Sequence, residues 1–178
     1  MGSNGGIKMT IKTKQLTLSG VLIAITVVLG VTGIGFIPVP TLAGAATLMH
    51  LPSVLAGIVG LEWVSPIIGL VFGLSSFKYM GDLRVVIPAR LLIGIVTFLI
   101  FALLKKKKWA IPIAAACGSI FNTVGTLGLG VLCGYIPAVG AGGAVAIGLA
   151  NGIPEAILSA IIITPIALAV LRYMKART

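Results

Sequence analysis

The chain has 178 residues, 58% of them hydrophobic and 9% charged, and its mean hydropathy is +1.20. A soluble domain carries about a quarter of its residues as charges, so this composition excludes a protein whose whole surface faces water. The net charge of +10 comes from short basic clusters between apolar segments, a pattern that sets membrane topology and argues against a nucleic-acid-binding surface.

Six apolar segments follow one another, and we predict that each forms one helix of an all-α membrane protein, a six-transmembrane-helix bundle. The fourth segment, 85–104, has twenty residues, and a helix of that length covers about 30 Å, the thickness of a hydrocarbon core. The third is short enough to be tilted or partly irregular. The predicted spans are 16–36, 41–60, 64–77, 85–104, 109–133 and 144–171.

The N-terminal residues 1–8 are expected to be a flexible leader of a kind that cloning can add, with Met9 as a plausible native start. Residues 9–178 then form a single six-helix transmembrane domain.

Basic residues predict the orientation of the helices. With both termini in the cytoplasm, ten basic residues flank the inner ends of the spans, against Lys78 and Arg84 at the outer ends. Because Lys and Arg resist translocation, this bias predicts an N-in, C-in protein of the cell membrane. The inner basic residues are Lys8, Lys12, Lys14, Lys105, Lys106, Lys107, Lys108, Arg172, Lys175 and Arg177.

A few polar side chains lie inside the predicted spans, where a charge near the bilayer centre costs about 2.5–3.5 kcal/mol. Arg90 lies in the outer part of the fourth span, Asn122 near the middle of the fifth and His50 in the outer part of the second. Asn151 and Glu155, four residues apart in the sixth span, share one helical face. The inner halves are almost wholly apolar. This distribution predicts a pocket that opens to the exterior and does not continue as a channel.

Each of these residues also has a structural explanation. Arg90 could pair with Glu155 or extend toward the interface, and an isolated Glu155 could be protonated. The asparagines could hydrogen-bond neighbouring helices, and His50 could bond a backbone carbonyl. If they face a solute instead, the Arg90 guanidinium suits a carboxylate and the asparagines suit hydroxyl or amide groups. The expected ligand is then small, polar and anionic.

Other functional classes have less support in the sequence. A membrane-embedded enzyme would need a matched acid, base or metal set, and only His50, Asp82 and Glu155 are available. A single histidine gives no metal-ligand spacing. The sequence also has no Gly-rich phosphate loop with Lys, so nothing in it indicates ATP use. A stand-alone channel would need polar lining through its inner half. We therefore expect no catalytic residue, no metal and no cofactor.

Gly20 and Ala24 form a small-xxx-small step on the first span. Small residues let helices approach closely in a membrane, so this step predicts either packing within the chain or docking to another membrane subunit.

At these residues the sequence resembles the substrate-binding S components of energy-coupling factor (ECF) vitamin transporters, and it is most similar to the pantothenate type. The similarity covers nearly the whole chain after Met9 and rests on the order of several short motifs. These are Gly20-Val-Leu-Ile-Ala24, Pro40 to Pro52, Ile68-Gly-Leu-Val-Phe-Gly-Leu-Ser75, Pro88-Ala-Arg90-Leu-Leu-Ile-Gly94, Asn122-Thr123 and Asn151-Gly-Ile-Pro-Glu155.

The resemblance implies a six-helix bundle that binds a vitamin, here pantothenate, from outside the cell. It also implies docking on an ECF transmembrane coupling subunit that two cytoplasmic ATPase subunits drive. Family knowledge places Gly20 and Ala24 on the docking surface, the loop before the second helix over the pocket, and Arg90 and Asn122 in pantothenate recognition. Gly20 stands where alanine is typical. Because specificity drifts readily in this family, folate, a cobalamin precursor and riboflavin stay open as alternative ligands.

Overall fold

The computed structural model describes residues 11–38, 45–80, 82–140 and 142–175. The predicted leader, residues 1–8, and residues 41–44 of the predicted second span lie outside this part of the chain. Helices dominate it, and one short two-stranded hairpin departs from the all-α expectation. In chain order the elements are α1 (Ile11–Thr32), β1 (Phe36–Pro38), β2 (Ala45–Thr47), α2 (Leu51–Val59), α3 (Ser65–Met80), α4 (Leu83–Val86), α5 (Pro88–Leu103), α6 (Ala110–Leu132), α7 (Ala144–Ile147), the π-helical turn η1 (Gly148–Gly152) and α8 (Ile153–Lys175).

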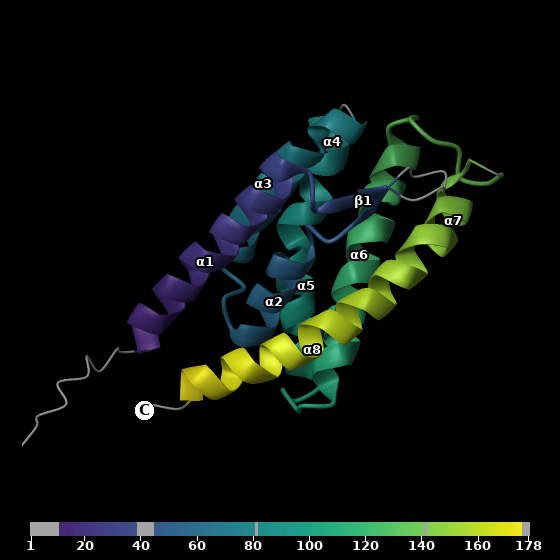
Figure 1. Ribbon diagram of the computed structural model, residues 1–178. Coiled ribbons are helices and arrows are strands. Elements are labelled where there is room, and N and C mark those ends of the chain that lie inside the picture. Colours follow the sequence, from purple (N-terminus) through teal and green to yellow (C-terminus); the bar gives the residue numbers. More distant parts are fainter. Residues whose placement is uncertain (1–10, 39–44, 81, 141, 176–178) are drawn as a thin grey trace, which may run out of the picture.

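The long helices surround the short helix α2. It packs against α3, α5, α6 and α8, while α1 covers α2 and α3. Figure 1 shows α2 in the middle of the bundle, with the hairpin crossing above it toward α6 and α7. The antiparallel pairs of that hairpin run from Phe36 opposite Thr47 to Pro38 opposite Ala45. One end of the bundle is therefore closed by a hairpin and not by a full-length helix.

Within the part of the chain that the structure describes, four stretches are long and apolar enough to cross a membrane: Thr13–Thr32, Leu83–Leu103, Ala110–Leu132 and Ala144–Lys175. They match the first, fourth, fifth and sixth predicted spans. The third predicted span corresponds to α3, whose apolar part, Ser65–Phe77, is shorter.

The second predicted span is wrong as a continuous helix, because Ala45–Thr47 forms a strand and only Leu51–Val59 is helical. Its helical part, α2, has 9 residues and is about 14 Å long at 1.5 Å per residue, less than half of a hydrocarbon core. Every residue from Pro52 to Val59 is buried, and Gly60 ends the helix in the left-handed conformation at φ 82°. The segment is apolar because it faces protein on all sides, a pattern that hydropathy cannot distinguish from exposure to lipid.

The first predicted span ends too late. α1 stops at Thr32, and Gly33 follows at φ 75°, a conformation that favours glycine and commonly terminates helices. Phe36, the predicted end of the span, instead belongs to β1.

Glycines allow the helices around the centre to touch backbone to backbone. A Cβ on Gly57 of α2 would lie 2.3 Å from the Gly94 carbonyl oxygen of α5. A Cβ on Gly94 would in turn lie 2.2 Å from the Ser65 hydroxyl. That hydroxyl accepts the Gly94 N–H at 3.0 Å and shares a 2.6 Å hydrogen bond with Ser53. Small residues thus bring α2, α3 and α5 together, as membrane helix packing requires.

Candidate functional site

Arg90 lies near the start of α5 and is held by α3. Gly69 makes the close approach possible, because a Cβ there would lie 2.2 Å from the Arg90 carbonyl oxygen. The side chain is buried; Nη1 donates to the Val86 carbonyl at 2.6 Å, and Cζ lies 4.5 Å from the centre of the Phe72 ring. A guanidinium over an aromatic face is favourable. The buried Nε atom has no hydrogen-bond partner in the described part of the chain.

Glu155, near the start of α8, does not pair directly with Arg90. Its Oε1 atom accepts the Thr47 backbone N–H at 2.6 Å, and its Oε2 atom accepts the Thr123 hydroxyl at 3.4 Å. Arg90 and Glu155 attract each other without contact, and the ion pair found among the described residues joins Arg84 to Asp82 instead. The interpretation of Glu155 as a direct salt-bridge partner of Arg90 is therefore wrong. Its contacts anchor the end of β2 to α6 and α8.

Buried oxygens line one face of α6. Ser119 Oγ, Asn122 Oδ1 and Thr126 Oγ1 have no hydrogen-bond partner within the described residues. Their spacing of three and four residues places them on the same side of the helix. Buried polar atoms in native proteins are almost always hydrogen-bonded to protein, water or ligand, so these three oxygens are available to water or to a polar ligand.

His50 immediately precedes α2 and is 1% exposed. The Thr47 backbone lies close to its ring, but neither ring nitrogen reaches a partner at hydrogen-bonding geometry in the described chain. Asn151 lies in η1, one turn before Glu155, and is buried with contacts of its own. The Thr47 backbone is close enough to interact with His50, so the alternative in which His50 bonds a backbone carbonyl stays open.

Thr47 and Glu155 connect the sequence-predicted residues. Glu155 bonds Thr47, which lies beside His50, and Thr123, which follows Asn122 on α6. Arg90 lies within electrostatic reach of the same carboxylate. The site therefore combines a buried cation, an anchored carboxylate, and unfilled donors and acceptors on α5, α6 and the start of α2. Such a set can bind and orient a polar anion.

Sequence reasoning missed several of these residues. Ser119 and Thr126 stand three before and four after Asn122, and this spacing could have revealed the shared helical face. Phe72 and Thr47 carried no such signal, because their roles depend on contacts with α5 and α8.

The predicted docking step lies on an open face of α1. Gly20 and Ala24 are exposed, and a Cβ on Gly20 would meet nothing within 4 Å. Among the described residues, Gly20 therefore makes no close helix contact within the chain, which leaves the docking interpretation as the one to test.

A family model for the substrate-specific component of ECF transporters matches residues 14–168. This match runs from α1 into α8 and includes every candidate residue described above. The chain belongs to this ECF substrate-specific component family. A search of curated proteins found no match.

Membership of the ECF substrate-specific component family gives the chain a role in transport and not in catalysis. It is the subunit that recognises a small-molecule substrate, and it works with the partners of an ECF module. The four long apolar helices agree with a multi-pass membrane protein.

Proposed function

We propose that this ECF component captures pantothenate at the outer face of the cell membrane. The observation that carries the proposal is the state of Arg90, a buried guanidinium whose Nε has no partner in the described chain and which touches no carboxylate there. A buried charge is unfavourable until a counter-charge and hydrogen bonds satisfy it. The carboxylate of a ligand would do both.

The other polar atoms suit the rest of pantothenate, which carries an amide and hydroxyl groups beside its carboxylate. The unfilled oxygens of Ser119, Asn122 and Thr126 would accept the ligand's N–H and O–H groups, and a His50 nitrogen would complete the set. Asn151 would line the same side, and Glu155 would hold the hairpin over the bound ligand through its bond to Thr47.

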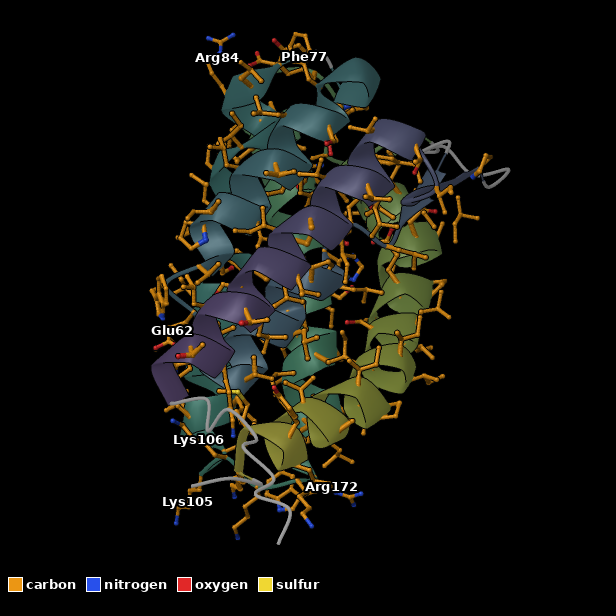
Figure 2. The ribbon with its side chains drawn as sticks, turned by 60° about the vertical axis from the view of Figure 1, so that its left-hand side comes forward. Glu62, Phe77, Arg84, Lys105, Lys106 and Arg172 are labelled. Atoms are coloured by element: carbon orange, nitrogen blue, oxygen red, sulfur yellow. The ribbon has the colours of Figure 1, made fainter. Side chains whose placement is uncertain are left out.

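The proposed orientation is N-in and C-in. Figure 2 places Lys105, Lys106 and Arg172 at one end of the bundle and Arg84 at the other. The positive-inside bias then puts the lysine-rich end in the cytoplasm and the hairpin toward the exterior. Release of the vitamin would require an ECF transmembrane coupling subunit, docked at Gly20 and Ala24, and two cytoplasmic ATPase subunits.

Binding of pantothenate to the purified protein tests the site. We expect Arg90→Ala to weaken binding by roughly ten- to a hundredfold, because a hydrogen bond to a charged group contributes about 1.5–3 kcal/mol. Isothermal titration calorimetry measures this loss. Arg84→Ala is the matched control, since Arg84 is an exposed cation that pairs with Asp82, and it should bind as the wild type does. Equal binding by wild type and Arg90→Ala would rule out the assigned pocket.

The alternative ligands are separated by a thermal-shift screen of the same protein. A ligand that binds the folded state stabilises it by RT ln(1 + [L]/Kd), so the unfolding temperature rises with the logarithm of the ligand concentration. If folate, a cobalamin precursor or riboflavin raises the unfolding temperature and pantothenate does not, that compound replaces pantothenate as the assigned ligand. Dependence of that shift on Arg90 would still support the site.

A further inference from the structure

A hollow lies at the opposite end of the bundle from the hairpin. It encloses about 450 Å³ between the end of α2, α5, the α5–α6 loop, α6 and the end of α8. Its walls are aromatic and aliphatic, including Ile58, Phe98, Phe101 and Leu168. Figure 2 shows Lys106 and Arg172 together at this end.

Four cations surround this apolar hollow: Lys106, Lys108, Arg172 and Lys175. No acidic side chain is among its lining residues. The whole chain has 3 acidic residues. Asp82 and Glu155 are engaged by Arg84 and by Thr47 elsewhere, and Glu62, in the loop two residues after Gly60, does not line the hollow. The hollow is therefore strongly positive around an apolar interior.

The backbone conformation of the α5–α6 loop places the Lys106 side chain against this hollow. Lys105 and Lys106 adopt φ values of 57° and 51°, a left-handed conformation that is unfavourable for residues with a side chain. The Lys106 N–H donates to the Phe101 carbonyl at 3.0 Å, and Lys106 Nζ lies 5.1 Å from the centre of the Phe98 ring. Its neighbours Lys105 and Lys107 do not line the hollow. Of the four consecutive lysines in this loop, Lys106 and Lys108 line the hollow, and Lys105 and Lys107 do not.

We infer that this hollow binds an anionic phospholipid, with the phosphate among the four cations and an acyl chain against the apolar wall. A free phosphate would satisfy the cations but leave the aromatic and aliphatic surface uncovered. Basic pockets between transmembrane helices are the usual form of anionic head-group sites. The lipid would join the ends of α2, α5, α6 and α8. This inference does not rest on the identity of the transported ligand.

The test is thermal unfolding of the purified full chain in a non-ionic detergent, together with native mass spectrometry of retained lipid. Phosphatidylglycerol should raise the unfolding temperature, whereas phosphatidylcholine with the same acyl chains and free glycerol phosphate should not. An equal shift with glycerol phosphate would show that a soluble phosphate suffices. Equal retention of both lipids would show that the head group is not recognised. Either result would overturn the inference.

Two double variants of equal charge locate the site. Lys106→Ala with Lys108→Ala should weaken phosphatidylglycerol binding by roughly ten- to thirtyfold, since each basic residue near an anionic surface contributes about 1 kcal/mol. Lys105→Ala with Lys107→Ala should change it by less than about twofold. Equal losses would assign the effect to overall charge and reject the pocket. The comparison of lipids on the wild type stands even if a variant fails to fold.

Discussion

Two buried ionisable side chains near the hairpin have different kinds of partner. Arg90 is held by the Phe72 ring and the Val86 carbonyl, whereas Glu155 accepts hydrogen bonds from Thr47 and Thr123. The 2.6 Å hydrogen bond from the Thr47 N–H to Glu155 is the contact that joins the hairpin to α8.

Substitution of Glu155 tests this anchor. Glu155→Ala should expose the Thr47 N–H to exchange roughly two- to tenfold faster, since a hydrogen bond contributes about 0.5–1.5 kcal/mol. Glu155→Gln keeps an oxygen acceptor, so its exchange rate at the Thr47 N–H should lie between those of the wild type and Glu155→Ala. Hydrogen exchange with mass spectrometry of the peptide containing Thr47 gives the rates. Unchanged protection in Glu155→Ala would mean that the hairpin is held by other contacts.

At the scale of the elements, close helix packing depends on a few glycines. Gly57 meets the α5 backbone, whereas Gly20, on the outer face of α1, meets nothing within 4 Å. The same residue type therefore has opposite consequences in two helices.

Alanine substitution distinguishes these two glycines. Gly57→Ala places a Cβ 2.3 Å from the Gly94 carbonyl oxygen and should destabilise the fold by about 1–3 kcal/mol, as overpacking does. Gly20→Ala should leave the unfolding temperature unchanged or slightly raised, because alanine favours helix formation. Thermal unfolding in detergent measures both. Equal effects would contradict the packing of α2 on α5.

A second contact between elements joins the loops at the hairpin end. Asp82 accepts the Arg84 backbone N–H at 2.7 Å, pairs with the Arg84 side chain and accepts the Tyr135 hydroxyl. The Arg84 side chain, followed by the Tyr135 hydroxyl, holds the pKa of Asp82 well below its usual range. The bond to Asp82 raises the pKa of Tyr135.

These shifts set the pH range over which the contact stabilises the protein. A lowered carboxyl pKa gives stability that is present above about pH 4 and lost as the pH falls through the lower folded value. A raised phenol pKa gives stability that is present below about pH 10 and lost as the pH rises through the folded value. The difference in unfolding temperature between wild type and Tyr135→Phe should therefore be constant from about pH 5 to 9 and shrink above about pH 10. Tyr173→Phe serves as the control. A difference that already disappears at about pH 5 would contradict the contact.

At the scale of the molecule, the first and last helices are joined at the lysine-rich end of the bundle. Lys14 Nζ donates to the carbonyls of Tyr173 and Met174 at 3.3 and 3.2 Å, so a basic residue of α1 caps the end of α8. Cations near a helix C-terminus are stabilising. This contact joins the first and last helices at the lysine-rich end.

The two cysteines report which end faces the exterior. Cys133 is exposed at the end of α6, close to the Tyr135 contact, and Cys117 is half-buried within the helix. A membrane-impermeant maleimide added to intact cells should label Cys133, and Cys133→Ser should abolish the signal. Labelling that requires permeabilised cells would reverse the proposed N-in, C-in orientation.

Composition and local spacing determined the class of protein and most of its helices. An apolar run long enough for a bilayer must be helical there, because no water can satisfy its backbone; 109–133 was predicted and Ala110–Leu132 is found. The same reasoning located the buried polar residues, since each interrupts an apolar segment.

The tertiary structure decided what those residues contact. Arg90 stacks on Phe72, Glu155 bonds Thr47, and α2 is enclosed by other helices. Hydropathy measures how strongly a segment avoids water and does not say whether lipid or protein replaces it. Which side chains meet depends on which helices, distant in sequence, can pack closely. Glycines such as Gly57 and Gly69 allow that close packing through contacts with other helices.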